Sequence, residues 1–370
     1  MTAARKPRLR LLPAPVKRAA WMGELRRAVT TVAELERRLV LTSEEREGAL
    51  RAEAAGLPIS ITPYYLSLAD RHDPSCPIRR QCVPHADEAR EIDGDLVDPL
   101  GEKAHEVAPD LVSRYPDRAL LLVSDRCSVY CRFCTRSRMV GAGGGARSLD
   151  YLAPAFAWLE AHPEIKDLIV SGGDPLVMST DRLAQLFTRI RAISSIETIR
   201  LATRAPVTIP SRVTPELVRA LRAFHPIWVM THFNHPQELT MKAEKACARF
   251  VEAGFPVMNQ TVLLRGINDD ASTLARLFRG LVRSRVRPYY LLQADPVRGT
   301  GHLRTPIETG LRVMEELQGR LSGIALPKFI VDTPGGMGKV PLSPNFVVHT
   351  RPGRTVLRTF RGIEVEYVDP

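Results

Sequence analysis

From about residue 111 onward, short apolar runs alternate with amphipathic segments. Strands are expected at 119–124, 167–171, 196–203, 228–233, 257–264 and 288–295. The segments between them repeat apolar residues at helical spacing, most clearly in 181–193. Strands that alternate with helices predict βα units around a parallel sheet. Six such units are too few for a closed eight-stranded barrel, so we predict an α/β fold with a partial, open (β/α)6 barrel over residues 111–324.

The first part of the chain has a helical pattern. Apolar residues recur at helical spacing from Trp21 to Leu39 and predict one helix. Thr42 and Glu45 form a capping box, which predicts the start of a second helix. Residues 70–110 are rich in Asp and Pro and are expected to be extended and to wrap around the body. We therefore predict that residues 21–110 form a helical N-terminal clamp without catalytic chemistry of its own.

Capping residues predict where several barrel helices begin. Thr214 followed by Pro215 is an N-cap with proline at the first helical position. Ser272 is expected to cap the helix that runs to Val282. Thr305 and Glu308 have the spacing of another capping box.

The pattern changes again after residue 325. Phe329–Asp332 has the composition of a strand, and the glycine-rich run from Thr333 to Lys339 that of a loop. Three further strands are expected at 346–350, 355–360 and 364–368, with a turn at Pro352-Gly353 between the first two. We predict that residues 325–370 contain this lysine loop and a small β-meander.

Composition and charge narrow the class of protein. The 370 residues are 44% hydrophobic, but no apolar run approaches the ~20 residues that span a bilayer. We recognise no signal peptide, and six cysteines in so long a chain do not indicate a disulfide scaffold, so we expect a location in the reducing cytoplasm. The net charge of the chain is +11. Residues 1–20 contain six basic residues and no acidic one: Arg5, Lys6, Arg8, Arg10, Lys17 and Arg18. We predict a flexible, solvated basic arm there; an RNA-binding arm or a transit peptide is the alternative, and a nucleic-acid partner is not expected.

Three cysteines lie close together directly after the first barrel strand. Cys127, Cys131 and Cys134 have the spacing C-x3-C-x2-C. A four-iron cluster normally takes four cysteine ligands, so three from one loop would leave one iron open to a substrate or cofactor. A structural zinc site usually needs a second ligand pair at a distance, and we find none in the sequence. A zinc loop and three unrelated buried thiols remain the alternatives.

Two glycine-rich segments follow predicted strands. Ser171-Gly172-Gly173-Asp174 ends the second barrel strand, where glycines would let the backbone approach a ligand closely; an ordinary turn is the alternative. Lys339 ends the glycine-rich run 333–338, which does not match a P-loop. This lysine could be a surface residue, or it could form a Schiff base with an aldehyde cofactor.

Together these segments resemble the lysine 2,3-aminomutases, a family of radical S-adenosylmethionine (SAM) enzymes that also use pyridoxal 5′-phosphate (PLP). The resemblance runs from about residue 20 to 350. It rests on these ordered segments: 61–68, 114–118, 127–136, 171–174, 203–206, 231–236, 259–260, 301–306 and 332–339.

The resemblance implies roles for cofactor-binding residues. Cys127, Cys131 and Cys134 would hold a [4Fe–4S] cluster. Ser171, Gly172, Gly173 and Asp174 would grip the amino end of SAM, and His232 and Gln260 would line its pocket. Lys339 would bind PLP covalently, Arg114 and Arg118 would hold its phosphate, and Tyr115 would lie near its ring. Arginine forks suit phosphate well.

The resemblance also implies a substrate and a reaction. Arg136 would bind the substrate α-carboxylate, while Asp295 and Asp332 would hold a side-chain ammonium group. Two acids that converge on one cation favour a diamino acid and repel the side-chain carboxylate of glutamate. The implied reaction moves the α-amino group of L-lysine from C2 to C3 and gives β-lysine. Alternatives are a 2,3-aminomutase for another amino acid such as arginine, or the enzyme that makes β-lysine for modification of a translation factor; the latter branch tends to lose the acid at Asp295.

The sequence departs from the family at one metal site. Some members bind structural zinc through C-terminal cysteines and a cysteine near position 270, where this chain has Asp270 and no cysteine after Cys247. We therefore predict no zinc. We also expect a homo-oligomer and an electron donor such as flavodoxin or ferredoxin. A non-enzymatic metal- and nucleic-acid-binding protein is the alternative of a different class, and the cofactor content of the purified protein would distinguish it.

Overall fold

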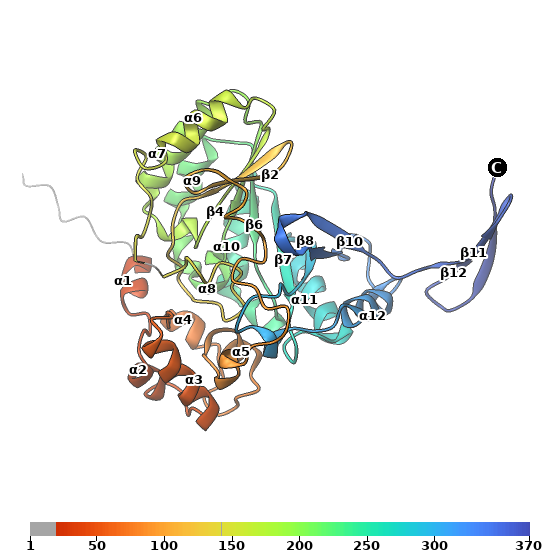
Figure 1. Cartoon of the computed structure of the whole chain (residues 1–370), viewed down its shortest axis with the longest axis horizontal. Coiled ribbons are helices and arrows are strands. Elements are labelled where there is room, and N and C mark those ends of the chain that lie inside the picture. The colour runs from red at the N-terminus through yellow and green to blue at the C-terminus, as the bar shows by residue number, and fades with distance from the viewer. Residues whose placement is uncertain (1–19, 142) are drawn as a thin grey trace, which may run out of the picture.

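The computed structural model describes residues 20–141 and 143–370. The core is one ten-stranded sheet in which the strands follow their order in the chain (Figure 1). Its parallel strands are β3 (Arg118–Leu122), β4 (Asp167–Ser171), β5 (Thr198–Ala202), β6 (Ile227–Thr231), β7 (Val257–Leu263), β8 (Arg287–Gln293) and β9 (Lys328–Asp332). The six predicted barrel strands are confirmed, each within two residues at either end.

Antiparallel strands extend both edges of the sheet. β1 (Glu106–Ala108) and β2 (Leu111–Tyr115) precede β3, and β10 (Lys339–Leu342) pairs with β9. Because β1 and β10 are the two ends of the strand order, the sheet stays open. The predicted α/β fold with an open, mostly parallel sheet is confirmed; the strand predicted at 329–332 is a seventh parallel strand of this sheet.

One main helix connects each pair of successive parallel strands. These helices are α6 (Ala153–Ala161), α7 (Thr180–Arg191), α9 (Pro215–Arg222), α10 (Met241–Glu252), α11 (Ala271–Arg283) and α12 (Ile307–Leu317); a short helix, α8 (Ala205–Thr208), precedes α9. Each buries an apolar face against the sheet, as Leu274, Leu277 and Leu281 of α11 do. The predicted count of six βα units is therefore confirmed.

Helix starts were predicted with mixed success. Thr214 caps α9 as expected, by accepting a hydrogen bond from the Leu217 amide. The cap predicted at Ser272 is wrong, because the N-cap of α11 is Asp270, two residues earlier. The Asp270 carboxylate accepts a hydrogen bond from the Thr273 amide. The capping box predicted at Thr305 and Glu308 is also wrong: α12 begins at Ile307 after Pro306 and has no side-chain cap.

The N-terminal part consists of short helices that lie against one end of the sheet (Figure 1). They are α1 (Ala20–Arg26), α2 (Val32–Glu36), α3 (Ser43–Ala54), α4 (Pro63–Leu66) and α5 (Pro77–Cys82). The single helix predicted from Trp21 to Leu39 is wrong, because Val29 leaves the helix to pair with Ile61 and Thr31 caps a new one. The capping box of Thr42 and Glu45 is confirmed at the start of α3.

The C-terminal strands form a second sheet that projects from the body (Figure 1). β11 (Val347–Arg351), β12 (Arg354–Arg358) and β13 (Glu364–Val368) are antiparallel, so the predicted meander is confirmed. No helix within 20–141 and 143–370 combines the length and apolar character needed to cross a membrane. Apart from Ala20, the predicted basic arm lies outside the described residues.

Candidate active site

A cavity of about 590 Å³ opens at the carboxyl ends of the parallel strands. This is the edge of a parallel α/β sheet where ligands usually bind. All the site residues predicted from the sequence line it: Arg114, Tyr115, Arg118, Cys127, Cys131, Cys134, Arg136, Ser171, Gly172, Gly173, Asp174, His232, Gln260, Asp295, Asp332 and Lys339. The structure thus brings together residues spread over more than half of the sequence, while their individual roles stay predictions.

The cysteine loop follows β3 and is held by the N-terminal part of the chain. Val129 pairs with Ile61, the Tyr130 amide donates to the Ser60 carbonyl at 2.8 Å, and the Arg132 amide donates to the Gln81 carbonyl at 2.9 Å. The Arg132 side chain also pairs with Glu88. The position of the loop is therefore set by a segment that lies far from it in sequence.

The three cysteines are free thiols on the cavity wall. Burial and the neighbouring Cys131 raise the pKa of Cys134 to about 11, so that this thiol needs a cation to become a thiolate ligand. Within 20–141 and 143–370, no three His, Cys, Asp or Glu side chains converge as the ligands of one ion. Zinc requires its ligands around one point, whereas each thiolate of a four-iron cluster binds its own iron. The donor set fits a cluster better than a single ion.

The Ser171–Asp174 segment packs directly on the start of the cysteine loop. A Cβ atom on Gly172 would lie 2.3 Å from the Ser124 carbonyl oxygen, and one on Gly173 equally close to that of Arg126. The Gly173 amide donates to Ser124 at 2.6 Å. Only glycine allows this close approach.

Asp174 links two loops of the cavity wall. Its carboxylate accepts the Leu176 and Arg204 amides and the Thr203 hydroxyl, at 2.7–2.9 Å. Burial raises the pKa of Asp174 in spite of these bonds. The carboxylate is fully engaged by protein donors, so in this segment the Ser171 side chain and the glycine backbone are the groups left for a ligand.

Lys339 and Asp332 face each other at the edge of the sheet. They are register partners on β10 and β9, and Lys339 Nζ forms an ion pair with Asp332. The Lys339 backbone amide donates to the Tyr115 hydroxyl at 3.0 Å. Burial and the nearby Arg114 guanidinium lower the pKa of Lys339 to about 8, although Asp295 opposes the shift. The amine is thus more readily deprotonated than that of an ordinary lysine.

Arginines surround the side of the cavity next to Tyr115. Arg118 stacks over the Tyr115 ring at 4.4 Å, and Arg114 donates to the Leu100 carbonyl at 3.0 Å. Arg200, which pairs with Asp167, lines the same cavity and was missed in the sequence because it lies in the middle of β5. Two arginines beside an aromatic ring, with Arg200 on the same cavity wall, are a suitable site for a phosphate-bearing aromatic cofactor.

Arg136 is held by an acid that was not predicted from the sequence. Glu102, only 2% exposed, accepts from Arg136 Nε at 2.8 Å and pairs with Arg138 through its other oxygen. Burial opposes ionisation of Glu102, but Arg136 and Arg138 together lower its pKa. Arg136 Nη1 points instead to the Ser171 hydroxyl at 3.4 Å. This nitrogen is the one best placed for a substrate carboxylate.

The two aspartates differ in their surroundings. Asp332 Oδ1 is buried and accepts no hydrogen bond among the described residues, although Arg114 Nη1 lies 3.8 Å away. Burial raises the pKa of Asp295 to about 6, although Lys339 and Arg114 oppose the shift. A substrate ammonium group in this part of the cavity would be attracted by both carboxylates.

His232 is a neutral ring deep in the cavity wall. Burial and the Arg204 charge lower the pKa of His232 to about 3. Its Nε2 atom lies 3.1 Å from the side-chain Oδ1 of Asn234, and its ring meets the ring of Phe133 edge-on. It can act in hydrogen bonding and packing but not as a cation at neutral pH.

The cysteine loop and the parallel sheet define the class of protein. A family model described as the radical SAM superfamily matches residues 121–278, and one described as lysine-2,3-aminomutase matches residues 314–370. An L-lysine 2,3-aminomutase of Fusobacterium nucleatum is 45% identical over 95% of this chain and 82% of its own length. The enzyme of the same name from Clostridium subterminale is 42% identical over 95% and 84%. The chain belongs to the lysine 2,3-aminomutase family of radical SAM enzymes.

The family also contains a relative named for a different amino acid. A glutamate 2,3-aminomutase of Clostridioides difficile is 37% identical over 94% of this chain and 82% of its own length. Membership therefore leaves the choice of amino acid to the residues of the site.

Proposed function

We propose that this chain is a SAM- and PLP-dependent aminomutase that moves the α-amino group of L-lysine from C2 to C3 and produces β-lysine. The observation that supports the proposal best is the arrangement of charge in the cavity. Arg136, Asp295, Asp332 and Lys339 line the same cavity, and the Arg136 charge is among the groups that shift the pKa of Asp295 and of Lys339. Such a site would bind an amino acid by its carboxylate and by a distant ammonium group.

Each predicted cofactor has a candidate set of residues. Cys127, Cys131 and Cys134 would hold a [4Fe–4S] cluster, with SAM beside Ser171 and the glycine backbone. Lys339 would bind PLP through its amine, and Arg114, Arg118 and Arg200 would neutralise its phosphate. When bound, these groups would supply one-electron hydrogen abstraction and a carbonyl that accepts the amino group.

The chain's own residues would position the substrate and control protons. Arg136 Nη1 would bind the carboxylate, since Glu102 occupies the Nε side of the guanidinium. The lowered pKa of Lys339 would make its amine available as a nucleophile near neutral pH. His232, whose pKa is lowered to about 3, would be too weak a base to take a proton from the substrate ammonium.

The paired acids favour lysine over the other candidates. A glutamate side chain would bring a third carboxylate beside Asp295 and Asp332, whose charges would repel it, whereas the ammonium group of lysine would be attracted. Arginine would satisfy both acids but needs more space. The presence of Asp295 argues against the branch that makes β-lysine for translation-factor modification.

Further parts of the proposal concern partners. An external one-electron donor of the flavodoxin or ferredoxin type is required by the chemistry, and we propose a homo-oligomer. Asp270 serves as the N-cap of α11, so we propose that this position takes no part in a zinc site.

An anaerobic amino-acid panel tests the proposed function. The reconstituted protein is incubated with SAM, PLP, dithionite and L-lysine, L-arginine, L-glutamate or L-alanine, and the products are separated by chromatography and identified by mass. We expect β-lysine from L-lysine alone, and its loss in Asp295→Asn. Rearrangement of arginine with inert lysine would overturn the substrate assignment but not the reaction.

A further inference from the structure

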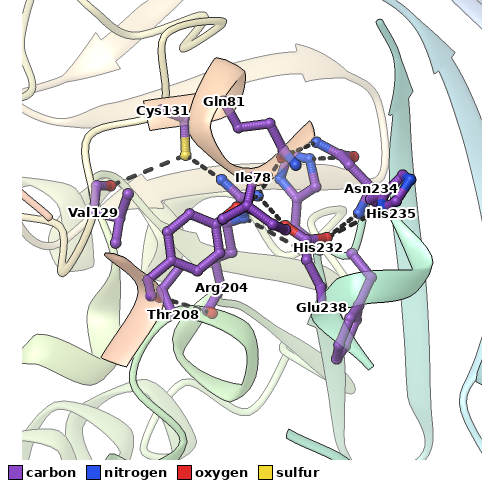
Figure 2. A network of polar contacts seen from close by, with 12 residues as sticks. Ile78, Gln81, Val129, Cys131, Arg204, Thr208, His232, Asn234, His235 and Glu238 are labelled. Atoms are coloured by element: carbon purple, nitrogen blue, oxygen red, sulfur yellow. Dashed lines mark hydrogen bonds and ion pairs between the residues drawn. The ribbon is translucent and has the colours of Figure 1, made fainter. Parts of the chain in front are cut away.

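Arg204 is a buried cation that contacts one of the three cysteines. It follows β5 and precedes α8, and only 8% of its surface is exposed. Its Nη1 atom donates to Cys131 Sγ at 2.7 Å (Figure 2). Among the described residues, no comparable side-chain hydrogen bond reaches the thiols of Cys127 or Cys134, so Cys131 has an environment of its own.

The position of the guanidinium is fixed by groups other than the thiol. Arg204 Nη2 donates to Gln81 at 2.6 Å, to Glu238 at 2.7 Å and to the Tyr65 hydroxyl at 3.1 Å, and Nε donates to the His232 carbonyl at 3.3 Å. These partners come from helices α4 and α5 and from the segment after β6, and Figure 2 shows Gln81, His232 and Glu238 around the guanidinium. These contacts direct Arg204 Nη1 at Cys131 Sγ.

Glu238 gives this network its stability. It is fully buried, and its second oxygen accepts the Asn234 and His235 amides at 2.6 and 3.1 Å. A carboxylate held in this way is a fixed partner for Arg204, and a buried ion pair with satisfied hydrogen bonds has little freedom to rearrange. The contact with Cys131 is therefore part of a rigid unit.

We propose that Arg204 is a positioning residue that tunes the iron–sulfur cluster through Cys131 and raises its reduction potential. A hydrogen bond to a ligating sulfur stabilises the more electron-rich state of a cluster. The step concerned is the uptake of one electron by the oxidised cluster from an external reductant, with no bond made or broken in the protein. This inference rests on the cluster site proposed above.

Redox titration of the anaerobic holoprotein tests the proposal. Wild type and Arg204→Gln are titrated with dithionite in the presence of mediators, and the reduced cluster is followed by electron paramagnetic resonance. At the wild-type midpoint we expect the ratio of reduced to oxidised cluster to fall about tenfold in the variant, which for one electron is about 59 mV. An unchanged midpoint would overturn the proposal.

Two further variants separate tuning from folding. Arg204→Lys keeps the charge but cannot contact both Glu238 and Cys131, so we expect a smaller shift of the midpoint potential in the same direction. If Arg204→Gln binds no cluster, the midpoint potential of Arg204→Lys is the test of the proposal. Arg212→Gln is the matched control, because Arg212 is fully buried and donates to the Leu176 and Met178 carbonyls without touching a thiol. It should lose stability and keep the wild-type potential. An equal shift in Arg212→Gln would overturn the proposal, whereas a wild type without an iron–sulfur cluster would overturn the proposed function itself.

Discussion

Lys339 combines a covalent role with an unusual environment. Its neighbours are Asp332, Asp295 and Arg114, and burial together with Arg114 lowers its pKa to about 8. With a lowered pKa, Lys339 has a larger neutral fraction near neutral pH than an ordinary lysine. Aldehyde chemistry needs the neutral amine, so the environment suits the proposed attachment of PLP.

This environment predicts the pH dependence of PLP attachment. Below pH 8 the rate at which the cofactor-free protein captures PLP should rise about tenfold per pH unit, because the neutral fraction of Lys339 rises, and it should level off above about pH 8. The change in PLP absorbance measures the rate, and borohydride followed by peptide mapping identifies the lysine. Lys339→Arg is the control and should trap nothing. A rate that still rises steeply at pH 10 would contradict the lowered pKa.

Glu102 offers a second test at the residue scale. Charge-assisted hydrogen bonds contribute about 1.5–3 kcal/mol, so Glu102→Gln should raise the KM for lysine about tenfold or more, with a smaller change in kcat, because Arg136 loses its fixed partner. Asp98→Asn removes the same charge from a residue that pairs with Arg138 alone and should leave KM nearly unchanged. Equal KM values for wild type and Glu102→Gln would show that Arg136 does not depend on this pair.

At the scale of elements, the site is assembled from loops that touch through their backbones. The Ser171–Asp174 segment after β4 lies against residues 124–126 after β3, with no space for a side chain between them. Close packing of this kind transmits a displacement from one loop to the other.

This contact predicts the effect of one added methyl group. Gly173→Ala should destabilise the protein by about 1–3 kcal/mol and lower the iron content, because its Cβ would meet the Arg126 carbonyl next to Cys127. Iron analysis and the thermal midpoint are the measurements. Gly323→Ala is the control, since a Cβ there meets no atom within 4 Å. Normal iron content in Gly173→Ala would show that the two loops are not coupled.

The elements also show what local sequence can predict. Strands β3 to β8 were found from apolar periodicity because each buries side chains against neighbours that follow it in the chain. The helix predicted across Val29 failed because the partner of Val29 is Ile61, a contact that no local pattern reports. The cap predicted at Ser272 failed because Asp270 supplies the capping carboxylate of α11.

At the scale of the whole molecule, the N-terminal part belongs to the site. Tyr65, Gln81, Glu88 and Glu102 each contact an arginine of the barrel loops. The prediction that residues 21–110 form a helical clamp did not include these contacts. Acids and amides that complete a site through space have no signature in sequence, whereas Cys127, Cys131, Cys134 and Lys339 were found because their spacing and glycine context are distinctive.

The central claim is the intramolecular movement of an amino group on L-lysine, and isotope labelling tests it most directly. The anaerobic, reconstituted protein is incubated with lysine labelled with ¹⁵N at the α-position, together with SAM and dithionite, and the product is examined by NMR. We predict β-lysine with the label on C3. Unchanged lysine from protein loaded with both the cluster and PLP, or β-lysine whose C3 nitrogen is unlabelled, would contradict the account.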